Sequence, residues 1–200
     1  YKVKGIPADK AKIIVCNGNF HGRTISIVSM SSDPDAYLDY GPFTPGFVKI
    51  PYNNIRALEE VLQDPCTAGF LVEPIQAEAG VILPGDGYLS ESYSLCRKYN
   101  ALFIADEIQT GLGRTGANLA CDHEHVRPDI LILGKALSGG TLPVSCVLAD
   151  DEIMLTIKPG EHGSTYGGNP LAAVVSMAAL DVLREENLAV NALSCGDIFR

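Results

Sequence analysis

Short apolar runs alternate along the chain with segments of helical periodicity. Six runs of four to seven residues are rich in Val, Ile and Leu and almost unbroken by charge, which is typical of strands buried on both faces. The predicted strands cover residues 12–16, 47–50, 69–73, 102–107, 129–135 and 144–149. Several of these runs end in a polar residue.

Helical patterns lie between the predicted strands. Residues 54–62 and 89–99 place apolar side chains at helical spacing. A longer helix is predicted over residues 170–186, because Asn169 is a favoured N-cap and Pro170 suits the first helical position. Strands that alternate with helices predict the α/β fold class, with a mainly parallel sheet and helices on both of its faces.

The chain is predicted to form one domain over residues 1–200. It contains no internal repeat, low-complexity tract or linker, and its composition, 46% hydrophobic and 20% charged, is that of a globular protein with a sizeable core. Two stretches rich in Pro and Gly, residues 33–46 and 158–168, are predicted to be ordered loops, and loops of this length usually carry function.

Charge and hydropathy exclude two classes of partner. The net charge is −9 and no run of three Lys or Arg occurs, so nucleic-acid binding is not expected. The longest strongly apolar stretch, residues 171–180, is too short to cross a membrane.

The six cysteines are 25 to 50 residues apart with no C-x-x-C pair, which predicts free thiols and an intracellular location. The first residues resemble the interior of a longer polypeptide.

Three polar residues lie at the carboxyl ends of predicted parallel strands, where α/β proteins bind ligands: Glu73, Asp106 and Lys135. Taken singly, each is most simply the first solvated residue of a loop. Together, an aspartate and a lysine at strand ends can hold pyridoxal phosphate, the lysine as a Schiff base and the aspartate against the pyridine nitrogen. Composition and spacing leave both interpretations open.

Longer strings resemble the signature segments of the class III, fold type I pyridoxal-phosphate aminotransferases over essentially the whole chain. These strings are LVEPIQAEAG (71–80), LFIADEIQTGLGRTG (102–116), PDILILGKALSGG (128–140) and GEHGSTYGGNPLA (160–172). The segments most similar to the class members that act on ornithine are NGNFHGRT (17–24), GPFTPGF (41–47) and IMLTIKPGEHGSTYGGNP (153–170). The resemblance implies that the chain is the cofactor-binding large domain, with the main phosphate-binding loop before residue 1 and a small domain after residue 200.

The resemblance also implies cofactor-binding residues. Lys135 matches the Schiff-base lysine, and Asp106 matches the partner of the pyridine nitrogen. Gln109 corresponds to the glutamine that hydrogen-bonds the phenolic oxygen of the cofactor. Phe20 corresponds to the aromatic residue that stacks on the pyridine ring, with His21 beside it.

Substrate and subunit contacts follow from the same resemblance. Thr165 matches the threonine that reaches the cofactor phosphate of a neighbouring subunit, so a homodimer or higher homo-oligomer is expected. Arg23 matches an arginine that holds a substrate carboxylate. Glu73 and Glu78 match acidic residues that line the substrate pocket. No metal is expected.

The implied reaction transfers the δ-amino group of L-ornithine to 2-oxoglutarate and yields glutamate semialdehyde and glutamate. Another class III activity, on acetylornithine or 4-aminobutyrate, is the nearest alternative, and a non-catalytic domain that keeps the fold is a more distant one. Residues 1–200 alone are expected to be inactive. The mitochondrial matrix or the cytoplasm is the expected compartment.

Two other patterns are weaker. Gly111, Gly113 and Gly116 fit the spacing of a dinucleotide-binding motif, but no helix is predicted to begin directly after the strand, as that motif requires. Residues 122–125, Asp-His-Glu-His, are adjacent in sequence and cannot easily converge on one metal ion, so a solvated loop is predicted there.

Overall fold

The computed structural model describes residues 2–199, which form two compact units that meet in sequence between Ala105 and Asp106. The elements of the first unit are β1 (Lys12–Cys16), α1 (Ile25–Ser29), α2 (Pro34–Tyr37), β2 (Phe47–Ile50), α3 (Ile55–Leu62), β3 (Thr67–Val72), α4 (Tyr88–Lys98) and β4 (Leu102–Asp106). Those of the second unit are the 3₁₀ helix η1 (Ala120–Glu124), β5 (Ile130–Leu133), the 3₁₀ helix η2 (Lys135–Ser138), β6 (Cys146–Ala149), α5 (Asp151–Met154), α6 (Pro170–Glu185) and α7 (Leu188–Phe199).

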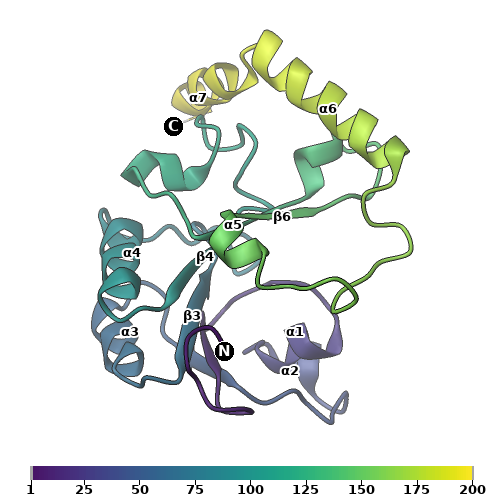
Figure 1. Cartoon of the computed structure of the whole chain (residues 1–200). Helices are drawn as coiled ribbons and strands as arrows, with labels where there is room; N and C mark the ends of the chain where they lie inside the picture. Colours follow the sequence, from purple (N-terminus) through teal and green to yellow (C-terminus); the bar gives the residue numbers. More distant parts are fainter. Residues whose placement is uncertain (1, 200) are drawn as a thin grey trace. The chain divides into compact units, whose positions relative to one another are not determined.

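The first unit contains parallel strands in the order β2-β1-β3-β4. In Figure 1, α3 and α4 lie on one side of β3, and α1 and α2 lie on the other. All six residues of β3 are buried, as expected for a strand that is covered on both faces. The predicted α/β class with a mainly parallel sheet is confirmed by this arrangement.

Phenylalanine side chains from neighbouring strands form the centre of the first unit. Phe70 of β3 and Phe103 of β4 have no exposed surface, and their rings meet edge to face with centroids 6.1 Å apart. Tyr93 of α4 packs edge to face on Phe103 at 5.9 Å. These contacts attach α4 to the sheet, because large aromatic side chains bury more apolar area than other residues.

The N-cap predicted at Asn169 forms through a local hydrogen bond, and Asn54, predicted as the first residue of its helix, caps α3 in the same way. The Asn54 side chain accepts the Ala57 N–H at 3.0 Å, and the Asn169 side chain accepts the Ala172 N–H at 2.9 Å. Each cap satisfies a backbone donor that has no partner within its own helix. The long predicted helix is therefore confirmed, with Pro170 in its first turn.

Some details of the second unit differ from the prediction. The strand predicted over residues 129–135 ends at Leu133, so Lys135 begins η2 instead of ending a strand. β6 runs antiparallel to β5, an orientation that an apolar run by itself does not encode.

In the first unit, α2 interrupts the loop predicted over residues 33–46. None of the helices within residues 2–199 has the length and apolar content needed to cross a membrane.

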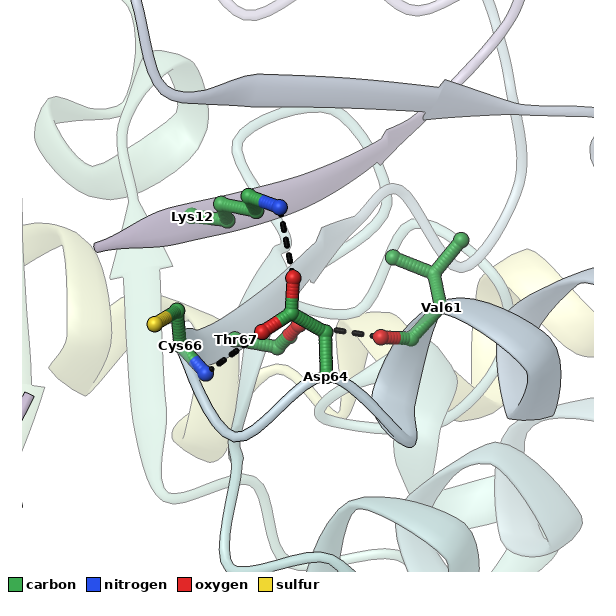
Figure 2. Close-up of polar contacts among 5 residues, drawn as sticks. All are labelled: Lys12, Val61, Asp64, Cys66 and Thr67. Carbon is green, nitrogen blue, oxygen red and sulfur yellow. Dashed lines mark hydrogen bonds and ion pairs between the residues drawn. The ribbon is translucent and has the colours of Figure 1, made fainter. Parts of the chain in front are cut away.

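An ion pair fastens β1 to the turn between α3 and β3 (Figure 2). The Asp64 carboxylate accepts hydrogen bonds from Lys12 Nζ at 2.5 Å and from the Cys66 N–H at 2.8 Å. The Val61 carbonyl accepts the Asp64 N–H at 3.1 Å and the Thr67 hydroxyl at 3.0 Å. The turn is thus held from both sides, and β3 begins at a fixed position beside β1.

Replacing Asp64 by asparagine is expected to reduce stability near pH 7 more than in acid. The hydrogen bond from Lys12 lowers the pKa of the Asp64 carboxyl from its ordinary value of 3.8. A carboxyl whose pKa is lower in the folded state stabilises it above the unfolded-state pKa, and this contribution disappears as the pH falls through the folded-state pKa. In urea denaturation, the difference between wild type and Asp64→Asn should therefore shrink below about pH 3.8.

The double variant with Lys12→Met provides the control for this pH dependence. Once Lys12 is absent, adding Asp64→Asn should produce a smaller acid-sensitive difference, because only hydrogen bonds from Cys66 then lower the pKa of the Asp64 carboxyl. A stability difference that stays constant from neutral pH into acid would contradict the prediction.

Candidate active site

The loop that follows β1, residues 17–24, carries three of the predicted site residues. The buried amide of Asn19 donates to the carbonyls of Cys16 at 2.6 Å and Met30 at 3.0 Å. The buried Gln76 side chain donates to the carbonyl of the first loop residue at 2.9 Å. Because these amides bond to main-chain carbonyls, they determine the path of the loop rather than the position of a single side chain.

Phe20, Arg23 and Glu73 come together at the carboxyl end of β3. The Phe20 N–H donates to Glu73 Oε2 at 3.0 Å, and the Arg23 guanidinium carbon lies 5.3 Å from the centroid of the Phe20 ring. Glu73 is only 6% exposed, and the Tyr52 hydroxyl donates to the Glu73 carbonyl at 3.2 Å. The Glu73 carboxylate therefore orients the Phe20 backbone, and its expected contact with substrate stays a prediction.

A hollow of about 240 Å³ lies in the first unit beside the same loop. Its lining includes the predicted residues Phe20, His21 and Glu78, together with Asp33. Glu78 is exposed, and with Asp33 it supplies carboxylates to a wall that, within residues 2–199, contains no lysine or arginine. A cationic group suits such a wall better than an anionic one.

Asp106, the last residue of β4, and Gln109, on the turn that follows, belong to the second unit. Asp106 is 5% exposed, and its Oδ1 accepts the Ile108 N–H at 3.1 Å. Gln109 is half-buried on the same turn. A buried carboxylate at the end of a strand needs polar partners, and the Ile108 amide is one of them.

Lys135 has an unusual backbone conformation. Its φ of +43° lies in the left-handed region, which non-glycine residues rarely adopt. The side chain is exposed. Strained backbone is concentrated at functional sites, so this conformation is consistent with a reactive lysine.

Thr165 is exposed in the glycine-rich loop between α5 and α6. The loop is ordered by its own hydrogen bonds, from the Lys158 N–H to Glu161 Oε2 at 2.7 Å and from the Gly167 N–H to Ser164 Oγ at 2.9 Å. The predicted ordered loop is thus confirmed, while the contact of Thr165 with a second subunit stays a prediction.

The two weaker sequence patterns have other structural explanations. A side chain at Gly111 would place its Cβ 2.8 Å from the Glu107 carbonyl, so packing within the turn explains this glycine. His123 Nε2 is 3.1 Å from both the carbonyl and the hydroxyl oxygen of Thr115. No group of three or more potential metal-binding side chains occurs among residues 2–199.

Sequence reasoning assigned no function to Glu107, although the structure buries it almost completely, at 1% exposed. The available signal was the pair of consecutive acidic residues that ends the apolar run of β4. Successive side chains of a strand point to opposite faces, so at least one of two such carboxylates is directed into the protein.

The protein family described as aminotransferase class-III matches residues 1–200. The chain belongs to this family. It is 64% identical over 200 residues to the mitochondrial ornithine aminotransferase of Rattus norvegicus, covering 100% of this chain and 46% of the relative. This class III chain spans about half the length of the curated relatives that it matches.

Solved structures agree with this assignment. One structure of the Toxoplasma gondii ornithine aminotransferase has a TM-score of 0.98 and 55% identity, covering 100% of this chain and 47% of that one. That protein contains pyridoxal phosphate at partial occupancy in its active site. The acetylornithine aminotransferase of Elizabethkingia anophelis matches with a TM-score of 0.85 and 55% identity, covering 100% and 46%. The fold type I architecture expected from the sequence is confirmed by these matches.

Proposed function

We propose that the protein transfers the δ-amino group of L-ornithine to 2-oxoglutarate with pyridoxal phosphate as cofactor, yielding glutamate semialdehyde and glutamate. The observation that carries this proposal is the 64% identity, over the whole chain, to the rat ornithine aminotransferase. The positions of Lys135 and Asp106 support the same chemistry, because the exposed amine of Lys135 comes after β5 and the buried carboxylate of Asp106 ends β4.

The side chains present fit this cofactor. Lys135 provides a primary amine for its aldehyde carbon, Asp106 a buried carboxylate for its pyridine nitrogen, and Gln109 an amide for its phenolic oxygen. In the first unit, Phe20 and His21 are proposed as further cofactor-binding residues, on a loop fixed by buried hydrogen bonds. When bound, pyridoxal phosphate supplies an electron sink that accepts the charge left on a deprotonated substrate carbon.

Lys135 and Asp106 are proposed to act on two different protons. With the cofactor bound, Lys135 Nζ would act as the base that takes the proton from the substrate carbon bearing the amine and returns it later. The Asp106 carboxylate would hold the pyridine nitrogen of the cofactor and keep it protonated. Because Asp106 is buried, water competes only weakly for that interaction.

Arg23 and Glu78 are proposed to orient the substrate. Ornithine carries one carboxylate and two amines, so its binding needs a cation and at least one anion. Arg23 lies beside the Phe20 ring, and Glu78 supplies a carboxylate to the hollow that the same ring lines. Glu73 is proposed to line the pocket as well, with one of its oxygens occupied by the Phe20 N–H.

Assembly and location belong to the same proposal. The expected contact of Thr165 with the cofactor phosphate of a neighbouring subunit supports a homodimer or a higher homo-oligomer. A mitochondrial location is proposed because the rat relative is a mitochondrial enzyme. The single large domain predicted over residues 1–200 is part of the proposal too.

A second candidate substrate is acetylornithine. The Elizabethkingia anophelis acetylornithine aminotransferase is 55% identical to this chain and matches it with a TM-score of 0.85. Acetylation removes the charge of the α-amine, so a pocket that holds this amine with a carboxylate discriminates against acetylornithine. The carboxylates of the hollow therefore favour ornithine.

Absorption spectroscopy of the intact protein with its cofactor tests the proposed function. Adding ornithine should change the cofactor absorption, because the first half-reaction moves the amino group to the cofactor. Adding 2-oxoglutarate should restore the absorption, because the second half-reaction removes that group. Acetylornithine and 4-aminobutyrate serve as comparison substrates, and we expect a higher kcat/KM for ornithine than for either. A preference for acetylornithine would replace the proposed substrate, and a spectrum that responds to none of the three would overturn the proposal.

A further inference from the structure

The Glu107 carboxylate lies at the centre of a buried hydrogen-bond network in the second unit. Its Oε2 accepts the Thr110 hydroxyl and the Ala120 N–H, the latter at 3.1 Å, and its Oε1 accepts the Cys121 N–H at 2.8 Å. Ala120 and Cys121 are the first residues of η1. One side chain therefore connects the turn after β4 with a helix that begins thirteen residues later.

Burial makes these contacts strong. Glu107 is 1% exposed, and an ionised carboxylate without water must be stabilised by protein donors. Hydrogen bonds from N–H and O–H groups to a charged acceptor are about twice as strong as neutral ones. The neighbouring Cys121 thiol is affected as well, since burial and the Glu107 carboxylate together raise its pKa.

The network encloses the turn that carries two of the proposed cofactor-binding residues. Asp106 precedes Glu107 directly, and Gln109 lies between Glu107 and Thr110, both of which belong to the network. The backbone of Glu107 is held as well, because its N–H donates to the Ile132 carbonyl at 3.0 Å. Rotation of the turn would break several of these bonds at once.

We propose that Glu107 is a positioning residue whose buried carboxylate holds Asp106 and Gln109 in the orientation that the cofactor needs. The roles of Asp106 and Gln109 toward the cofactor rest on the proposed function, whereas the hydrogen bonds by which Glu107 fixes the turn do not. Glu107 acts through its neighbours. Its replacement should therefore disturb the turn before it affects any reacting atom.

Amide hydrogen exchange of the intact protein without cofactor tests this hold directly. The Ile108 amide reports on Asp106, because it donates to Asp106 Oδ1. Glu107→Gln replaces one acceptor oxygen by an NH₂ group, which cannot accept a hydrogen bond from the N–H and O–H groups that surround it. We expect the Ile108, Ala120 and Cys121 amides to exchange roughly tenfold to a hundredfold faster, the effect of losing a buried bond to a charged group.

Asp122→Asn is the matched control. The Asp122 carboxylate accepts the Leu119 N–H at 2.9 Å, so this variant weakens the same end of η1 without touching the turn. It should leave Ile108 exchange unchanged. Unchanged exchange of Ile108 in Glu107→Gln, or equal acceleration in both variants, would overturn the proposal.

A second pair of variants keeps the test decisive if Glu107→Gln does not fold. Thr110→Val removes the hydroxyl that donates to Glu107, and Thr110→Ser retains it. In the protein with cofactor, Thr110→Val should shift the pH midpoint of the cofactor absorption, and Thr110→Ser should restore the wild-type value. Equal midpoints in Thr110→Val and wild type would overturn the positioning role. If wild type shows no cofactor absorption, the proposed function fails. The positioning role is then tested separately by amide exchange of Thr110→Val without cofactor, in which Ile108 should exchange faster than in wild type.

Discussion

Lys135→Ala is expected to abolish covalent attachment of pyridoxal phosphate and to slow transamination by a factor of at least about 10²–10⁴, the usual contribution of a positioned acid–base group. The exposed amine of Lys135 is proposed both to bind the aldehyde and to move the proton. Alanine supplies neither function. Borohydride reduction followed by peptide mass spectrometry locates the adduct, and a single-turnover assay with ornithine measures the rate.

Lys10→Ala is the control for this variant, since Lys10 is exposed in the first unit, outside the proposed site. It should keep both the adduct and the rate of the wild type. A borohydride adduct of unchanged yield in Lys135→Ala would place the Schiff base on another lysine and end the assignment. The variant should fold normally, because the Lys135 side chain is exposed and alanine, which also carries a Cβ, adds no backbone strain beyond that already present at the φ of +43°.

Asp106→Ala is expected to preserve the fold while slowing the half-reaction with ornithine by about 10²–10³-fold, the range found when one preorganised electrostatic partner is removed. Asp106 is buried at the end of β4, and its carboxylate is proposed to keep the ring nitrogen protonated. Without it, the charge left on the substrate carbon is delocalised less effectively. Stopped-flow absorption of the cofactor measures the rate of proton removal.

Asp106→Asn separates charge from shape in the same experiment. Its side-chain oxygen still accepts the Ile108 N–H, so the turn should keep its geometry while the negative charge is lost. We expect the rate to fall nearly as far as in Asp106→Ala, with a smaller loss of stability in thermal denaturation. Near-normal half-reaction rates in either variant would contradict the electrostatic role of Asp106.

The sequence alone located much of the architecture, because the signals involved are local. Runs such as residues 12–16 and 47–50 became strands with the same bounds, since short runs rich in Val and Ile favour parallel strands. Asn54 and Asn169 cap their helices through bonds to residues three positions away, which a short string of sequence already contains. The candidate residues were likewise found from strings of consecutive letters, and their roles remain predictions.

Tertiary structure decided what depends on distant segments. Periodicity could not show that Glu107 is directed inward, because its donors come from the turn and from η1, which pack together only when the chain folds. Nor could an apolar run predict that the strand before Lys135 stops at Leu133 and that Lys135 turns into the left-handed region. Glu73 obtained its partner, the Phe20 amide, from a loop 53 positions earlier. Hydrophobic pattern determines which segments are buried, whereas the direction of a particular polar side chain depends on which donors the fold brings to it.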